Sequence, residues 1–180
     1  MKIRNVHERR FRATDPVSGL IDSLASPAEA LWPLESWPRM VLDRPLQVGA
    51  AGGHGPIRYT VEAYQPGASI RCRFTGPKGF NGSHGYEIVA IGPECVVLRH
   101  VLEMTTSGLA ILSWPLVYRP LHDALIEDSL ATAEASLGYS PSVQPWSTWV
   151  RFLRWLVSRG RAKPQVAPQK PTQRTTFGCD

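Results

Sequence analysis

Apolar and polar residues alternate with a period of two in several segments before Gly108, a pattern typical of strands with one buried face. Turn signals such as Gln-Pro-Gly at 65–67 and Asn-Gly at 81–82 separate these segments. Strands are expected over residues 2–13, 40–48, 57–64, 70–75, 85–91 and 94–106. Six consecutive strands with short connections predict an antiparallel meander, and such a sheet curls readily.

Two short helices are expected between the first strand and the rest of the sheet. The tripeptide Thr-Asp-Pro at 14–16 offers a helix cap followed by proline in the first turn. Ser26 and Glu29 have the spacing of a capping box, which predicts a second short helix that ends at about Trp32.

The longest amphipathic segment covers residues 109–137, and Gly138 is a typical stop signal after it. Pro115 and Pro120 predict irregular first turns, so the regular helix is expected to begin near Arg119. A single long helix with one apolar stripe must bury that stripe against one face of the curled sheet.

This order of elements resembles the helix-grip fold of the SRPBCC superfamily, which includes START lipid-transfer domains, birch-pollen-type allergens and polyketide cyclases. Local stretches similar to bacterial members are GGHGPIRYTV (52–61), YQPG (64–67), FTGPKGF (74–80) and RPLHDAL (119–125). The fold class implied is α+β, with a curved antiparallel sheet wrapped around a long C-terminal helix and two short helices after the first strand. These stretches are turns and helix starts, so they indicate a fold and hardly any chemistry.

Three parts are expected along the chain. Residues 1–139 form the helix-grip domain, residues 140–159 form a basic, Trp-rich amphipathic helix, and residues 160–180 form a tail. This tail is rich in Pro, Gln and Thr, a composition that buries little apolar surface, so it is expected to be disordered.

The net charge of +5 is distributed unevenly along the 180 residues. Residues 1–145 carry 13 Lys and Arg against 14 Asp and Glu, whereas residues 146–180 carry seven basic residues and a single acidic one. Phosphate contacts need a concentrated basic face, so nucleic-acid binding by the nearly neutral folded domain is not expected.

Superfamily members that bind apolar ligands hold them in a cavity between the sheet and the long helix, and the resemblance implies such a cavity here. One or two of His84, Tyr86 and His100 would orient the polar end of a hydrophobic, lipid-like or polyketide-like molecule. Alternatively, these polar groups belong to the core and are satisfied by backbone carbonyls or by one another. The expected ligand-contacting residues are Tyr59, Phe74, His84, Tyr86, His100, Leu102, Met104, Tyr118, Leu121 and His122.

An enzyme of the cyclase or dehydrase type is a second interpretation, because a histidine pair near a tyrosine can move protons. No residue matches a catalytic signature. The five His and three Cys residues show no CxxC, no HExxH and no ligand pair at helical spacing, so neither a metal site nor a cofactor is expected. The glycine-rich run at 49–55 lacks the Gly-Lys-Ser/Thr ending of a phosphate loop and is interpreted as a hairpin loop.

The C-terminal segment supports a third interpretation, an interaction module. Its aromatic and basic residues are typical of a helix that lies on an anionic membrane, although packing on the domain or across a homodimer is an equally open alternative. The expected contact residues are Trp146, Trp149, Arg151, Arg154 and Trp155.

A cytoplasmic location, with peripheral membrane contact as an option, fits these features. No apolar run approaches about 18 residues, and the N-terminal segment MKIRNVHERRF has no hydrophobic stretch typical of a signal peptide. The three cysteines show no disulfide pattern.

Overall fold

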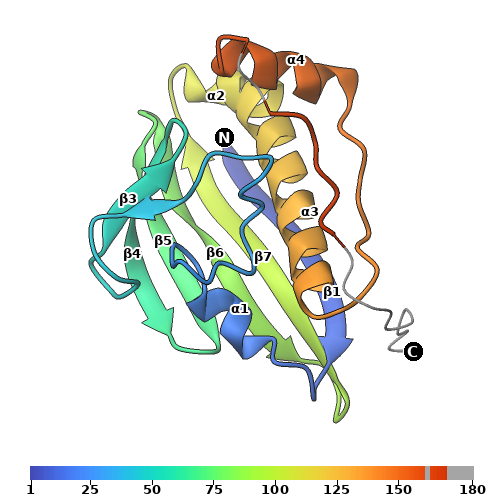
Figure 1. Ribbon diagram of the computed structural model, residues 1–180. Coiled ribbons are helices and arrows are strands. Elements are labelled where there is room, and N and C mark those ends of the chain that lie inside the picture. Colours follow the sequence, from blue (N-terminus) through green and yellow to red (C-terminus); the bar gives the residue numbers. More distant parts are fainter. Residues whose placement is uncertain (161–162, 170–180) are drawn as a thin grey trace.

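In the computed structural model, which describes residues 1–160 and 163–169, all strands belong to one curved antiparallel sheet (Figure 1). The strand order is β1-β7-β6-β5-β4-β3-β2, so the predicted meander is confirmed. The first strand extends the sheet at one edge by pairing with the last strand, β7. The strands are β1 (Lys2–Arg12), β2 (Val41–Leu42), β3 (Ala51–His54), β4 (Ile57–Gln65), β5 (Ser69–Gly76), β6 (Phe80–Ala90) and β7 (Cys95–Thr106). The expected strand at 40–48 is reduced to β2, and the glycine-rich run contributes β3.

Two glycines in β6 allow its neighbouring strands to approach closely. A Cβ atom at Gly82 would collide with the backbone of Glu103 in β7, and one at Gly85 would collide with the backbone of Ile70 in β5. The predicted turn at Asn-Gly 81–82 is therefore wrong, because Gly82 serves close strand packing inside β6 rather than a reversal of the chain.

The long helix crosses the concave face of the sheet (Figure 1). Its start is irregular, as Pro115 and Pro120 predict. The chain passes through a short helix α2 (Ala110–Ser113) and a π-helical turn η1 (Trp114–Tyr118) before the regular helix α3 (Arg119–Ser136). Gly138 has a φ of +86°, which fits its predicted role in stopping the helix.

Of the two short helices expected after β1, the structure forms α1 (Ser18–Asp22), but the second is wrong. The carboxylate of Glu29 accepts hydrogen bonds from the backbone amides of Ala25, Leu31 and Trp32 at 2.8–3.2 Å. These amides are then unavailable for a regular helical ladder, so residues 23–32 form successive turns around one side chain.

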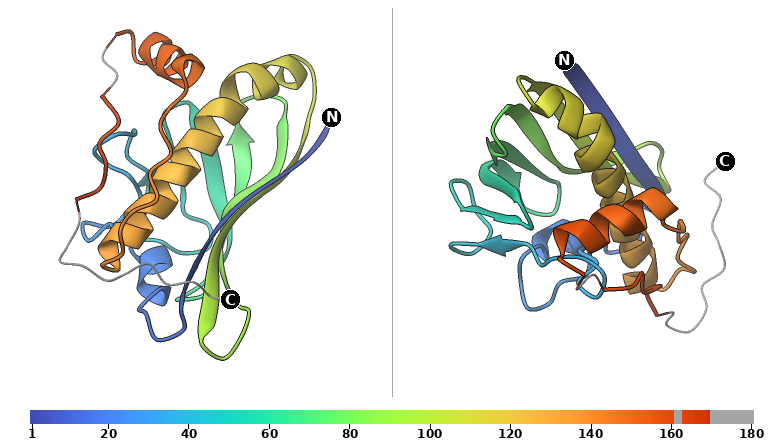
Figure 2. Two further views of the ribbon diagram at one scale, coloured as in Figure 1. Left: turned by 90° about the vertical axis from the view of Figure 1, so that its right-hand side faces the viewer. Right: turned by 90° about the horizontal axis from the view of Figure 1, so that it is seen from above.

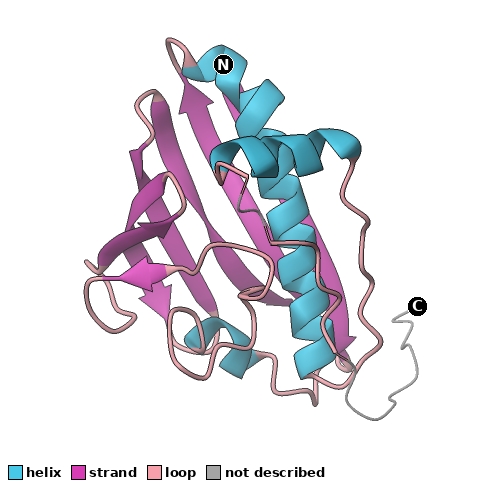
Figure 3. Cartoon of the chain, turned by 45° about the horizontal axis from the view of Figure 1, so that its top comes forward, coloured by secondary structure: helices cyan, strands magenta, loops and turns pink. Residues whose placement is uncertain are grey.

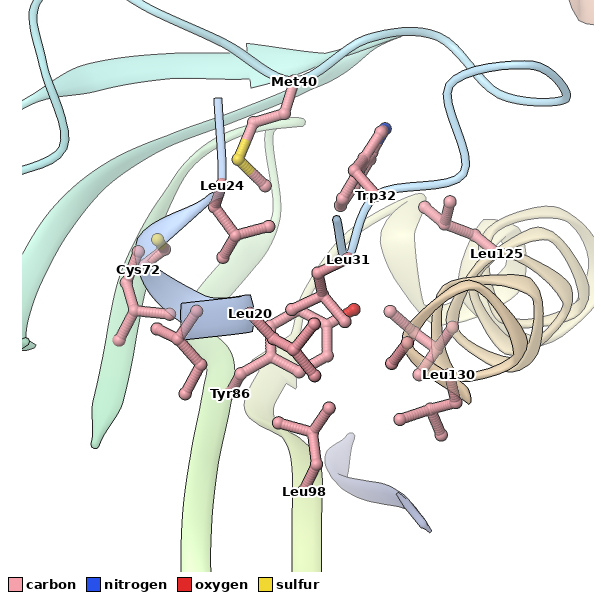
Figure 4. Packing of buried hydrophobic residues seen from close by; sticks show 14 of the residues in the cluster. Leu20, Leu24, Leu31, Trp32, Met40, Cys72, Tyr86, Leu98, Leu125 and Leu130 are labelled. Carbon is pink, nitrogen blue, oxygen red and sulfur yellow. The ribbon is translucent and has the colours of Figure 1, made fainter. Parts of the chain in front are cut away.

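The main core lies between the sheet, α1 and α3 (Figure 4). Leu20 and Leu31 lie close to Leu98 of the sheet and Leu130 of α3, and all four are almost fully buried. The periodicity of β7 is thereby confirmed, since Leu98, His100, Leu102 and Met104 all face inward.

The helix α4 (Thr148–Val157) lies across α3 at the end of the molecule that carries α2 (Figure 2). Ser147 caps it by accepting a hydrogen bond from the Val150 amide at 3.2 Å. Beyond it, Gln165 donates to Asp128 at 2.8 Å, and the amide of Val166 donates to Ser36 at 2.9 Å. The rest of the predicted disordered tail, residues 161–162 and 170–180, lies outside the described residues.

Candidate functional site

A cavity of about 1010 Å³ opens between the concave face of the sheet and the helices. Strands β5 to β7, the helical segments η1 and α3, and α4 contribute to its wall, together with the loop at 32–40 and the turn between β3 and β4. Ligand pockets commonly occupy roughly 300–1,000 Å³ and are mostly apolar with few polar groups. This cavity is therefore large enough for a sizeable small molecule, and four histidines are among the polar residues of its lining.

Eight of the ten residues expected at a ligand line the cavity: Phe74, His84, Tyr86, His100, Leu102, Tyr118, Leu121 and His122. Two do not. Tyr59 lies behind the wall, where its hydroxyl is 3.2 Å from Nδ1 of His54, and Met104 packs against Leu102 and Trp114 in a second apolar cluster.

The central polar feature of the wall is a pair of buried imidazoles. Nδ1 of His84 lies 3.4 Å from Nε2 of His100, and the ring of His84 stacks on Phe74 with 4.7 Å between centroids. The two outer nitrogens, Nε2 of His84 and Nδ1 of His100, have no hydrogen-bond partner within the described part of the chain.

Proton counting shows what this pair lacks. Two neutral imidazoles hold two protons on four nitrogens, and the contact between them uses one N–H group and one lone pair. Whichever ring donates, one N–H donor and one acceptor remain unpaired. An unsatisfied buried group costs about 1–3 kcal/mol, so the pair favours a partner that offers both an acceptor and a donor.

The cavity histidines are held neutral. Burial lowers the pKa of His84 and of His100 well below the usual value, and neighbouring imidazoles add to this effect. Burial likewise lowers the pKa of His54 to about 3. At neutral pH the wall therefore carries imidazole groups that donate and accept hydrogen bonds without charge.

Tyr86 is less available than the sequence suggested. Ser129 donates its hydroxyl proton to the carbonyl of Leu31 at 2.9 Å. The Tyr86 hydroxyl, 2.7 Å from the same Ser129 oxygen, must then donate to it. The Tyr86 proton is used inside the core, so among the three residues expected to orient a ligand only His84 and His100 retain unused hydrogen-bonding capacity.

His84, His100, His122 and His7 form a row of neighbouring imidazole rings, and the His122–His7 end of this row contacts carboxylates. The ring of His122 lies 5.0 Å from that of His100 and 5.9 Å from that of His7, measured between centroids. His7 contacts Glu127 through Nδ1 at 2.7 Å and Asp123 through Nε2 at 3.3 Å. Although burial opposes it, these two carboxylates raise the pKa of His7 to about 9.

Sequence reasoning missed the part of the wall that comes from the loop at 32–40, from the end of β3 and from α4. The missed lining residues include Trp32, Trp37, Met40, His54 and Arg154. Loops have no periodicity that assigns a side to each residue. The two Trp-Pro dipeptides at 32–33 and 37–38 are the only local signal, since exposed loops seldom carry such large apolar residues.

The five residues expected to contact a membrane or partner divide into two groups. Trp149, Arg151 and Trp155 are exposed, but Arg154 is buried between the rings of Trp37 and Trp146, 4.0 Å from each centroid. The indole of Trp146 also donates to Asp128 at 2.8 Å. The prediction that Trp146 and Arg154 contact a membrane or partner is therefore wrong, and both residues attach α4 to the domain. A desolvated guanidinium is stabilised by the two aromatic faces on either side of it.

No protein-family model and no curated protein matches the sequence. Solved structures do match. A protein from Thermobifida fusca aligns with a TM-score of 0.54 at 14% identity, over 77% of this chain and 99% of its own. CalU16 from Micromonospora echinospora aligns with 0.51 at 13%, over 88% and 94%. XoxI from Bacillus cereus aligns with 0.54 at 12%, over 74% and 94%.

Identities this low speak only for the fold. The strand order, the single long helix across the concave face and these alignments agree with one another. The chain therefore has the helix-grip fold that its sequence resemblance implied.

Proposed function

We propose that the cavity binds a largely apolar small molecule, lipid-like or polyketide-like, that carries a neutral polar group. The observation that carries this proposal is the His84–His100 pair, which retains one unused donor and one unused acceptor in the wall of a mostly apolar cavity. A hydroxyl group can meet either of these two nitrogens, because it both donates and accepts, and a carbonyl group can accept the unused N–H.

Two contributions to affinity follow from the lining. Each Å² of apolar ligand surface removed from water contributes about 25 cal/mol. A correctly placed polar group adds about 0.5–1.5 kcal/mol for each hydrogen bond that it forms. A carboxylate at the same position would lose its hydration without gaining an opposite charge, because the paired imidazoles are neutral.

Native mass spectrometry of protein purified without detergent, followed by solvent extraction, is the first test. A co-purified apolar molecule supports the proposal and identifies its chemical class. Fluorescence titration with pyrene and hydroxypyrene then separates the two contributions, since these probes share one apolar body. We expect wild type to bind hydroxypyrene about tenfold more tightly than pyrene.

Three variants sharpen this titration. His100→Phe should retain pyrene binding and lose the preference for the hydroxyl group, whereas Leu121→Trp should fill the cavity and abolish both. The matched control is Leu112→Trp, which makes the same change on the exposed surface of α2. Pyrene binding that survives Leu121→Trp unchanged would overturn the cavity assignment.

A cyclase-type or dehydrase-type enzyme is the second candidate, because the same pair places two contacting imidazoles in the cavity wall, and imidazole is the commonest proton-transfer group of enzymes. The variant His84→Gln separates the two functions. Glutamine can donate and accept hydrogen bonds but cannot relay a proton at neutral pH, so a binder retains its ligand and an enzyme loses turnover. The readout is mass spectrometry of the extracted ligand before and after incubation with wild type and with the variant.

We also propose that one end of the molecule contacts an anionic membrane surface. The segments α2, η1 and α4 lie at the same end of the molecule (Figure 3), and each carries exposed apolar side chains. Trp149 joins α4 to η1 by donating to the Leu116 carbonyl at 2.8 Å. Exposed Arg119, Arg151 and Arg159 add positive charge. This end patch comprises Leu109, Leu112, Leu116, Trp149, Phe152, Trp155 and Leu156.

Two features support this orientation. Aromatic and basic side chains on one helix face are typical of interfacial helices. Val157, the last residue of α4, and Ser158 after it also border the cavity. A bound membrane would then lie next to the cavity wall through which an apolar ligand could pass.

Vesicle co-sedimentation tests this contact. Binding to phosphatidylglycerol-containing vesicles, reduced by salt and lost in the double variant Trp149→Ala/Trp155→Ala, is expected. The control Val41→Ala/Val48→Ala removes exposed apolar side chains elsewhere and should leave binding unchanged. A dimer in analytical ultracentrifugation that the tryptophan variant dissociates, without vesicle binding by wild type, would overturn the proposal in favour of self-association.

A further inference from the structure

Between β1 and α3, beside the cavity wall that His122 also lines, one ligand atom each from His7, His122 and Asp123 lies within 4.8 Å of the others. The hydrogen-bond contacts join Oδ1 of Asp123 to Nε2 of His7 and to Nδ1 of His122. The Asp123 oxygen lies 3.3 Å from the His7 nitrogen and 3.2 Å from the His122 nitrogen. No other cluster of this kind occurs among residues 1–160 and 163–169.

These separations suit a small divalent ion. Zinc binds imidazole nitrogen and carboxylate oxygen at about 2.0–2.1 Å, which places neighbouring ligands of a tetrahedron about 3.3 Å apart. Both measured separations agree with that value. The site needs only a short movement of the third pair, His7 and His122, to close around an ion.

The groups behind these atoms have the arrangement that metal-binding histidines require. Nδ1 of His7 faces Glu127 Oε1 at 2.7 Å, so a proton held there leaves the lone pair of Nε2 for a metal. Glu127 is held in turn by Arg9 at 2.6 Å. The other oxygen of Asp123 lies 3.5 Å from Arg119, which leaves Oδ1 for the site.

Two unpaired atoms at the same place point to a missing partner. The amide nitrogen of Asn5 donates to Asp123 Oδ1 at 2.9 Å, while the buried Asn5 Oδ1 has no partner among the described residues. Rotating this amide by half a turn exchanges its nitrogen and oxygen, and presents an oxygen as a fourth ligand. Nε2 of His122 is also buried without a partner in the described chain, and it would carry the ring's proton when Nδ1 binds a metal.

We propose that His7, His122 and Asp123 bind a divalent transition metal ion, Zn²⁺ by preference, with the Asn5 amide oxygen or water in the fourth position. Two imidazoles and one carboxylate form a borderline donor set that suits zinc better than calcium or magnesium. The Asp123 side chain is 33% exposed and also lines a groove along α3, so this ligand is in contact with solvent. The site would join β1 to α3.

Titration of the EDTA-treated full-length chain with Zn²⁺ in a calorimeter, and with Co²⁺ in a spectrophotometer, tests the proposal. One ion per chain, a higher melting temperature and Co²⁺ absorption without a sulfur charge-transfer band are expected. His7→Gln and Asp123→Asn should abolish this binding. Glu127→Gln, which removes the group behind His7, should weaken it about 10-fold to 100-fold.

The matched control is Glu103→Gln, because Glu103 is a carboxylate of β7 that pairs with Arg4 of β1 on the exposed surface. X-ray absorption of the zinc-loaded wild type provides a readout that needs no variant, with two imidazoles and oxygen ligands expected. Absence of binding, ligation through sulfur, or binding retained in correctly folded His7→Gln would each overturn the assignment and leave these residues as an ion-pair network.

Discussion

The two ends of one row of histidines differ in charge although both are removed from water. His84 and His100 line the cavity, where burial lowers the pKa of each. Burial acts on His7 in the same direction, but the hydrogen bonds and charges of Asp123 and Glu127 outweigh it and raise its pKa to about 9. At His122 between them, burial outweighs the contact with Asp123 and lowers the pKa. The balance between burial and nearby carboxylates therefore decides which histidines of this protein are cations.

The acid limb of stability should show the largest effect. The folded-state pKa of His54, His84 and His100 lies below the unfolded value of about 6.5, so the unfolded chain binds more protons in acid. Stability is then present above that value and is lost as the pH falls. Between about pH 6.5 and 5 the loss should be about 2 kcal/mol for each histidine that stays neutral, measured by urea unfolding at a series of pH values. An acid limb equally steep in His100→Phe would contradict this account.

A carboxylate placed beside the inner pair should break the comparison. Leu102 lies opposite His84 in the β6–β7 register, so Leu102→Asp would put a charge next to a neutral imidazole. We expect the free energy of unfolding to fall by about 3–5 kcal/mol, because a buried charge and a lost core side chain both cost stability. NMR titration should show the pKa of His84 rising towards that of His7. The matched substitution Leu112→Asp on the exposed surface should change stability little.

The decrease in stability at alkaline pH, measured on metal-free protein, tests the contribution of His7 at the outer end of the histidine row. Because the folded-state pKa of His7 is raised, its contribution is complete below about pH 6.5 and is lost as the pH rises towards about 9. The loss should reach about 1–3 kcal/mol. Asp123→Asn/Glu127→Gln should remove this limb and lower stability at neutral pH, which unfolding curves at two pH values can measure. A limb unchanged in the double variant would assign it to another group.

The smallest effect is expected where a carboxylate faces a cation in water. Glu103 and Arg4 lie 2.9 Å apart, but both side chains are more than half exposed. Glu103→Gln should therefore change stability by no more than about 0.5 kcal/mol at any pH between the two limbs, since solvent screens exposed pairs. A larger change would show that charge at β1 matters without burial.

Local patterns predicted most of the fold. The period of two identified the inner face of β7. Pro115 and Pro120 predicted irregular turns before the regular helix α3, which begins at Arg119. Such patterns succeed because a strand or helix buries one side along its whole length, so that many neighbouring residues carry the same information. Eight of ten expected wall residues followed from this alternation and from the long helix.

The errors occurred where a single side chain outweighed the local pattern. Glu29 was read as part of a capping box, but its carboxylate instead organises a series of turns. Arg154 was expected at a surface, but it lies between two tryptophans. Neither result follows from neighbours in the sequence, because the deciding contact is made by one specific side chain, in the case of Arg154 with distant residues.

By itself, the sequence determined the curled sheet, the long helix and the apolar inner face with its histidines, because these depend on periodicity along the chain. Only the tertiary structure decided that His84 and His100 form a pair, and that His7 from β1 meets His122 and Asp123 from α3. Charge and hydrogen bonding act over a few ångströms in space. Which histidines are charged, and which atoms lack a partner, was therefore settled by packing between strands and a helix far apart in the chain.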